Sequence, residues 1–239
     1  MENNLTNVKD YYIEFEGIRE LREALEALRE YTKAIDFDKA FKYNEQHFRR
    51  FVEQTGFMIP MQWQPWEVHE FPISNREDGE KILLDYYKAD NSANLNIIFD
   101  DIKDFINKNH MKWNSLITDC LVCYENNLFK PIVPSLISVI EGIITESNDI
   151  NNGYKNKINE YCKKQGMDSS FTRIIWTSIA VYFDNLYRFK KFNEERAPFL
   201  NRHWIQHGRD NSALWREIDV IQLFCALHTI MTLRYGREI

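Results

Sequence analysis

The sequence predicts an all-α protein, and two properties of the chain lead to that prediction. Apolar residues recur at three- and four-residue intervals in nearly every segment, which is the spacing of one face of an α-helix. Glycine and proline, which interrupt helices, number only 8 and 6 among the 239 residues. Hydrophobic residues make up 44% of the chain, enough for a substantial core. We therefore expect long helices joined by short polar turns, the pattern of an up-down helical bundle.

Residues 1–110 are predicted to form an N-terminal helical region. Apolar residues at the spacing of a short, two-heptad seam mark its first helix: Ile18, Leu21, Leu25 and Leu28. Aromatic residues indicate a second helix: Phe37, Phe41, Phe48 and Phe51. Three prolines between residues 57 and 75 exclude a regular helix there. Because two tryptophans lie in the same stretch, we expect an ordered, packed loop.

Two further helices are predicted after this loop. Ser74 and Glu77 have the spacing of a capping box, which would start the first of them. Apolar residues mark both helices: Ile82, Leu83 and Tyr86 in the first, and Leu95, Ile98, Ile102, Phe105 and Ile106 in the second. The predicted N-terminal region ends near residue 110. No Gly/Ser-rich linker follows it, so we expect it to pack against the rest of the chain.

Residues 111–239 are predicted to form a second helical region, a bundle. Its first helix begins near Trp113 and ends near Asn126. Pro131 and Pro134 are expected in the first turn of the next helix, where proline is tolerated. That helix is apolar almost all round, so we expect it at the centre of the bundle.

Three more helical segments complete the predicted bundle. Ser169 or Ser170 can cap a long amphipathic helix. Residues 194–207 can form a helix, with Gly208 as its terminator. The last long helix is expected to start after Asn211-Ser212.

The most informative stretch is a short polar run between apolar helices, Asn201-Arg202-His203-Trp204-Ile205-Gln206-His207-Gly208. Arginine supplies a permanent planar cation that matches a phosphate, and histidine supplies a proton donor or acceptor near neutral pH. Phosphoryl-transfer chemistry needs those two groups. On an ideal helix Arg202 and His207 point about 140° away from each other. Either the helix ends or kinks inside the motif, or two chains combine their motifs at a dimer interface.

Glu141 is the second residue of interest, because Ile137 and Ile144 flank it on an apolar helix face. An unpaired carboxylate there would be costly. We expect it to pair with a cation, and Arg202 is the favoured partner. The alternatives are that Glu141 belongs to another buried polar network or faces solvent at an edge.

A run of alternating basic and aromatic residues, Tyr187-Arg188-Phe189-Lys190-Lys191-Phe192, lies just upstream of the polar motif. Arg188, Lys190 and Lys191 are candidate RNA-binding residues, because charge and stacking together guide single-stranded RNA. The alternative is the end of an amphipathic helix whose cations extend into solvent.

The polar motif resembles the R-x(4)-H motif of the HEPN superfamily, whose active members are metal-independent ribonucleases. The resemblance covers roughly the C-terminal half of the chain. It implies that the RNA 2′-hydroxyl attacks the adjacent phosphate, while His207 transfers a proton and Arg202 stabilises charge on the phosphate. His203 fills a position at which the family usually has a polar residue, and Asn201 is a further polar support.

The same resemblance implies an RNA substrate and a homodimer with both motifs in one cleft. It also implies a toxin or antiphage effector, which a regulatory or antitoxin partner would restrain. The alternative is a non-catalytic helical dimerisation module that binds a protein or nucleotide partner.

No metal or cofactor is expected. His203 and His207 are four residues apart, as in some metal sites, but no third ligand is evident. Cys120 and Cys123 form one C-x-x-C pair without a second pair. The net charge of −6 argues against a protein that coats nucleic acid nonspecifically.

The chain is expected to be cytoplasmic. Its polar N-terminus lacks the apolar segment of a signal peptide. No apolar run is long enough to span a bilayer, so no membrane partner is expected. The cysteines are then expected to be reduced.

Overall fold

The computed structural model describes residues 46–48, 50–60, 75–109, 112–146 and 170–235, which all belong to the compact unit Asn44–Ile239. Helix accounts for 77% of them, and none of the described residues lies in a strand, so the all-α prediction is confirmed. The helix predicted around residues 18–28 and both tryptophans of the predicted loop lie outside the described residues. Described residues on both sides of position 110 belong to this one unit, and the boundary there stays a prediction.

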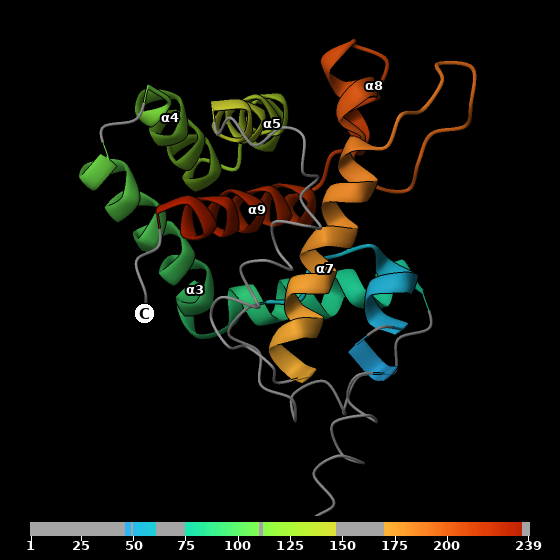
Figure 1. Cartoon of the computed structure of the whole chain (residues 1–239), viewed down its shortest axis with the longest axis horizontal. Coiled ribbons are helices and arrows are strands. Elements are labelled where there is room, and N and C mark those ends of the chain that lie inside the picture. Colours follow the sequence, from blue (N-terminus) through green and yellow to red (C-terminus); the bar gives the residue numbers. More distant parts are fainter. Residues whose placement is uncertain (1–45, 49, 61–74, 110–111, 147–169, 236–239) are drawn as a thin grey trace, which may run out of the picture. The chain divides into compact units, whose positions relative to one another are not determined.

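The described part of the chain contains, in order, α3 (Arg76–Asn109), α4 (Asn114–Glu125), α5 (Phe129–Glu146), α7 (Ser170–Tyr187), α8 (Arg202–Gln206) and α9 (Glu217–Tyr235) (Figure 1). A 3-10 turn, η1, spans Ser212–Leu214. Residues 46–48 and 50–55 are also helical. Helix α9 packs against both α5 and α3, α4 packs against α5, and α8 contacts α5 and α7. The HEPN-like topology of the bundle stays a prediction.

Helices α5 and α9 form the centre of the core. Fully buried apolar side chains on α9 are Ile218, Val220, Ile221, Leu223, Phe224, Ala226, Leu227 and Met231. Those on α5 are Ile132, Val133, Leu136, Ile137, Val139 and Ile140. Because successive helical residues point about 100° apart, the buried run of α9 covers nearly every side of that helix. The buried residues of α5 instead share one broad face, and Pro134, Ser138 and Glu141 on the other face are partly exposed. The prediction that α5 is buried almost all round is wrong, because one of its faces is partly exposed. Helix α9 is instead buried nearly all round, and α5 packs against it.

Helix α3 is two helices joined by a break, as the sequence predicts. Ala89 is extended, and the three residues Asp90, Asn91 and Ser92 have positive φ angles of 48°, 57° and 63°. Left-handed backbone cannot continue a right-handed helix. The side chain of Asn94 donates to the carbonyl of Tyr86 (3.1 Å) and so satisfies one acceptor left free by the break.

Details at two helix starts, those of α3 and α5, differ from the predictions. The cap seen at α3 is Asn75, whose Oδ1 accepts from the backbone N–H of Asp78 (2.8 Å). Pro134 lies inside α5 rather than in its first turn. Helix α9 begins at Glu217, after Asn211-Ser212 as predicted, and Asn211 caps the 3-10 turn η1 that precedes it.

Residues 57–60 belong to the predicted loop, lie outside any helix and are packed as expected. Phe57, Met58 and Ile59 are each at most 2% exposed. The side chain of Gln222 on α9 accepts from the backbone N–H of Met58 (2.6 Å), and Ser178 on α7 accepts from that of Ile59 (3.0 Å). These contacts satisfy backbone N–H groups that lie outside any helix.

Candidate functional site

The polar motif forms a five-residue helix, α8, with a cap at each end. Asn201 is the N-cap: its Oδ1 accepts from the backbone N–H of Trp204 (3.2 Å), and its Nδ2 donates to the carbonyl of Arg188 (2.8 Å). Gly208 has a φ of +65° and ends the helix, so its predicted terminator role is confirmed. The expectation of a helix over residues 194–207 is wrong, because residues 188–201 are irregular and the Asn201 cap starts the helix later.

Arg202 and His207 therefore occupy the two ends of α8. Arg202 is its first residue, and His207 is its C-cap with φ −98° and ψ 11°. Among the contacts of the described residues, none joins Arg202 to His207. Helix α8 thus ends inside the motif, as one of the two geometric alternatives requires. The Arg202 side chain contacts Glu141, and the His207 ring contacts His203.

Arg202 forms a two-point ion pair with Glu141 on α5, which confirms the favoured pairing. Arg202 Nε donates to Glu141 Oε2 (2.9 Å), and Arg202 Nη2 donates to Glu141 Oε1. The two side chains are 32% and 31% exposed, so solvent reaches the pair. Gln206 adds a second link between α8 and α5, because its Nε2 donates to Ser138 Oγ (3.0 Å). The carboxylate orients the guanidinium and leaves Arg202 Nη1 without a hydrogen-bond partner in the described structure.

Close packing beside Glu141 fixes the position of α5. A Cβ atom added at Gly142 would lie 2.1 Å from Cζ2 and 2.6 Å from Cε2 of the Trp113 indole. Such contacts are far shorter than van der Waals separation, so only glycine allows the ring to lie against the helix there. Trp113 immediately precedes α4, and the contact sets the spacing of α4 and α5 next to the acidic partner of Arg202.

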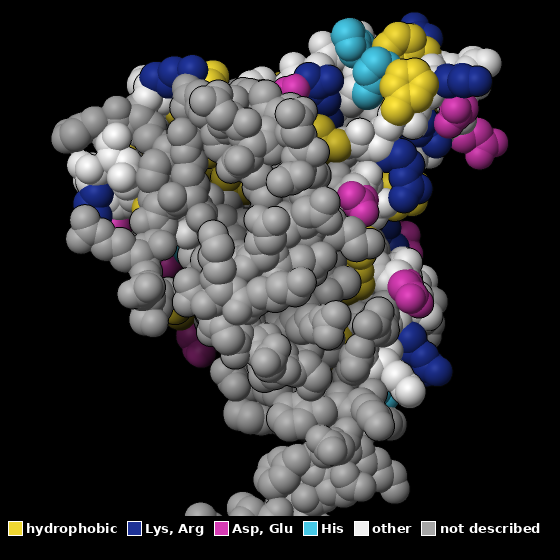
Figure 2. Space-filling view, in the orientation of Figure 1, with side chains coloured by type: hydrophobic (Ala, Val, Ile, Leu, Met, Phe, Trp, Pro, Cys, Tyr) yellow, Lys and Arg dark blue, Asp and Glu magenta, His cyan; other side chains and the backbone are white. Residues whose placement is uncertain are grey.

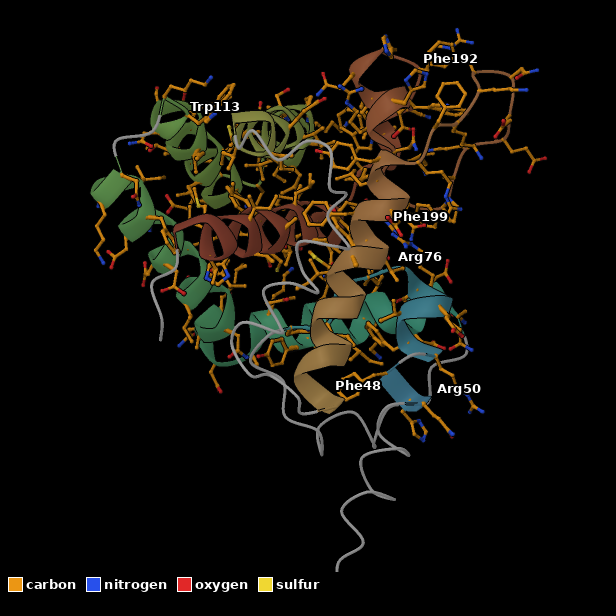
Figure 3. The ribbon with its side chains drawn as sticks, in the orientation of Figure 1. Phe48, Arg50, Arg76, Trp113, Phe192 and Phe199 are labelled. Carbon is orange, nitrogen blue, oxygen red and sulfur yellow. The ribbon has the colours of Figure 1, made fainter. Side chains whose placement is uncertain are left out.

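The histidines belong to an aromatic cluster that we define as Phe189, Phe192, His203 and His207. The rings of His203 and Phe192 are stacked, with centroids 4.8 Å apart and an interplanar angle of 5°. His207 meets His203 edge-on at 4.7 Å, and Phe189 meets His203 at 5.1 Å. Histidine and hydrophobic side chains gather with Lys and Arg over α8 in Figure 2, and Figure 3 shows Phe192 on the loop beside α8. The cluster thus places two imidazoles side by side at the surface.

The candidate RNA-binding run lies mostly outside any helix, because α7 ends at Tyr187. Lys190 is partly engaged: its Nζ lies 3.8 Å from Glu194 and 5.9 Å from the Trp204 ring centroid. Arg188 and Lys191 are exposed, and neither forms an ion pair within the described residues. RNA contact by these three cations stays a prediction.

Asp210 is a buried anchor that the sequence did not reveal. Its side chain is 3% exposed and accepts from Arg196 Nε (2.6 Å), from Arg196 Nη2 (3.3 Å) and from Trp215 Nε1 (2.8 Å). Arg196 lies in the irregular loop before α8, and Asp210 follows α8. The ion pair therefore ties together the two ends of the segment that carries the motif.

A second polar network, also not predicted, lies away from α8. Arg76 Nη2 is 3.5 Å from Asp219 Oδ1, and their side chains are only 11% and 6% exposed. Burial lowers the pKa of Arg76 and raises the pKa of Asp219. The Arg76 guanidinium lies 4.1 Å from the centroid of the Phe57 ring and 5.9 Å from the centroid of the Phe199 ring. Figure 3 labels Arg76 and Phe199. The network joins the start of α3 to the start of α9, and its position between core helices marks it as structural.

The described part of the chain contains no group of three or more histidine, cysteine or acidic side chains arranged to hold an ion. Burial raises the pKa of Cys120 and of Cys225 to about 12, so both thiols stay protonated near neutral pH. None of the described helices is long and apolar enough to cross a membrane.

In comparisons with known proteins, no family model, curated protein or solved structure matches the chain.

Proposed function

We propose that the chain is a metal-independent endoribonuclease of HEPN type that acts as a toxin or antiphage effector. One observation carries the proposal most strongly. A five-residue helix presents two adjacent imidazoles, 4.7 Å apart, and an arginine that a carboxylate holds in position. These groups supply proton transfer and anion stabilisation, the two requirements of RNA cleavage by its own 2′-hydroxyl.

In the proposed reaction, the 2′-oxygen bonds to the adjacent phosphorus as the bond from phosphorus to the 5′-oxygen breaks. The proton of the 2′-hydroxyl goes to a base, and the leaving 5′-oxygen receives a proton from an acid. His207 transfers one of these protons, because it is exposed and lies at the end of α8. The products are a cyclic phosphate and a 5′-hydroxyl. No metal is required, because the substrate carries its own nucleophile.

Arg202 is assigned to the phosphate. Glu141 engages Nε and Nη2 of its guanidinium, so Nη1 can donate to a non-bridging phosphate oxygen. His203 is stacked on Phe192, which restricts rotation of its ring. We therefore assign His203 to orientation or to a phosphate contact, with Asn201 as the cap that fixes the start of α8.

The proposed active form is a homodimer with both motifs in one cleft. Arg202 and His207 stand at opposite ends of α8, and a second copy would bring an arginine of one chain near a histidine of the other. A regulatory or antitoxin partner is proposed to restrain the activity.

The test is RNA cleavage by wild type, Arg202→Ala, His207→Ala and the double variant, all purified identically. Lys103→Ala is a matched control, because Lys103 is an exposed cation on α3. We expect wild type and control to cleave single-stranded RNA in EDTA, with cyclic-phosphate ends, and the three motif variants to be inactive.

Two results would contradict the proposal. Cleavage by the double variant at the wild-type rate would remove Arg202 and His207 from the reaction. Loss of wild-type cleavage in EDTA would replace the mechanism with a metal-dependent one. If wild type binds a partner and dimerises but never cleaves RNA, the non-catalytic interaction module is the correct function.

A further inference from the structure

Phe189 is an exposed ring on a fixed backbone, and the fold gives no reason for its exposure. It is 71% exposed, and Phe192 beside it is 42% exposed. Yet the carbonyls on both sides of Phe189 are held: Asn201 Nδ2 donates to that of Arg188 (2.8 Å), and Trp204 Nε1 donates to that of Lys190 (3.2 Å). A large apolar ring held at the surface in this way is ready to stack on a flat ligand.

The charge around this ring is opposite to that of the whole chain. Residues 188–209 carry six basic and two acidic side chains, a net charge of +4, whereas the chain carries −6. Arg196 is paired with Asp210 and Arg202 with Glu141. Lys190 is paired with Glu194. The remaining three cations of the segment are exposed, and within the described structure no ion pair involves them: Arg188, Lys191 and Arg209.

Arg209 connects the charge to the aromatic cluster. Its guanidinium carbon lies 5.1 Å from the centroid of the Phe192 ring, and its side chain is exposed. A ligand that places a flat ring on Phe189 would therefore find cations on the adjoining surface. Alternating rings and anionic links are the chemistry of a nucleic-acid strand.

We propose that Phe189 forms a subsite for an unpaired nucleobase, with Arg209 and Lys191 contacting the phosphates that adjoin it. The base must be unpaired, because a base inside a duplex is already covered on both faces by its neighbours. This inference rests on the proposed function and deepens it: the subsite adjoins His203, and it would hold the strand beside the reacting phosphate. Phe189 is thus a residue that selects single-stranded substrate.

The experiment uses the full chain and a single-stranded oligonucleotide with 2′-O-methyl groups, which cannot be cleaved by 2′-hydroxyl attack. Binding is measured by fluorescence anisotropy for wild type, Phe189→Ala, Phe189→Trp and Val122→Ala. Val122 is the matched control, an apolar side chain on α4 that is 51% exposed. We expect Phe189→Ala to weaken binding about 5- to 100-fold, the usual effect of losing one stacked base. Phe189→Trp and Val122→Ala should bind like wild type.

Charge and strandedness provide two further readouts. Arg209→Ala should weaken binding and lower the slope of log affinity against log salt by about 0.7, the value for one phosphate contact on a single strand. A blunt duplex of the same sequence should bind wild type and Phe189→Ala equally. The subsite is refuted if Phe189→Ala binds the single strand like wild type. It is also refuted if Phe189→Ala weakens binding of an acidic peptide as much as of the oligonucleotide.

Failure of the subsite and failure of the nuclease are distinguishable. If wild type cleaves RNA but Phe189→Ala binds and cleaves normally, the subsite is wrong and the nuclease stands. If wild type never cleaves but Phe189→Ala loses single-strand binding, the subsite stands and the nuclease is wrong.

Discussion

The ion pair between Glu141 and Arg202 should make a small, measurable contribution to stability. Glu141→Gln keeps the shape and one acceptor oxygen but removes the charge. Both side chains are about one-third exposed, which places the pair among solvent-screened ion pairs, worth roughly 0.2–1 kcal/mol. Because two hydrogen bonds join Arg202 to Glu141, we expect a coupling free energy near the upper end of this range, about 0.5–1 kcal/mol.

A double-mutant cycle measures this coupling directly. The free energy of unfolding is obtained by urea titration for wild type, Glu141→Gln, Arg202→Gln and the double variant. The matched control is the cycle at Asp100 and Lys103, a more exposed pair separated by 3.7 Å, for which we expect a coupling close to zero. A coupling at Glu141 and Arg202 no larger than in this control would refute the reasoning.

The same variants separate positioning from catalysis. Arg202→Gln should abolish RNA cleavage, because it removes the group that contacts the phosphate. Glu141→Gln should leave residual cleavage, because Arg202 remains and is only less well oriented, a loss of at most about 100-fold. Equal losses in the two single variants would show that Arg202 acts only through its pairing with Glu141.

Three further outcomes follow from buried contacts. Gly142→Ala should destabilise the protein by about 1–3 kcal/mol in thermal melts, because its Cβ would overlap the Trp113 ring; an unchanged melting temperature would contradict that packing. Burial raises the pKa of Asp219 in the folded chain above its ordinary value of 3.8. Between the unfolded and folded pKa values the folded chain holds a proton that the unfolded chain has lost, so the free energy of unfolding falls as pH rises through this range. The free energy of unfolding of Asp219→Asn, measured below pH 3.8 and at neutral pH, should rise relative to that of wild type as pH rises. The opposite trend would count against the raised pKa of Asp219. Gln222→Leu should cost about 1–3 kcal/mol and speed hydrogen exchange at the Met58 amide, which would lose its buried acceptor; undiminished protection of that amide would exclude the contact.

Local sequence patterns predicted the long described helices and some of their ends. The break in α3 was predicted because two apolar series flank a polar gap, and Gly208 was predicted because glycine tolerates a positive φ. The late start of α8 had a signal too, since Asn201 is a preferred N-cap residue and Pro198 lies just before it. The prediction of a helix over residues 194–207 gave these two residues too little weight.

Contacts between distant segments were harder to predict. The pairing of Glu141 with Arg202 was predicted because a carboxylate on an apolar face needs a cation, and the motif supplied one. No comparable reasoning selects Arg76 as the partner of Asp219, because many cations could satisfy one acid. Likewise, the stacking of Phe192 on His203 depends on the path of an irregular loop, and periodicity carries no information about such a path.

The motif depends on its surroundings because a five-residue helix is too short to be stable alone. Asn201 starts α8 and also holds the loop through Arg188, while Gln206 and Arg202 tie the helix to α5. The orientation of the two histidines is therefore set by side chains that would take no part in the chemistry. Substitution at the Asn201 cap should disturb the motif and the exposed Phe189 together, because one side chain fixes both backbones.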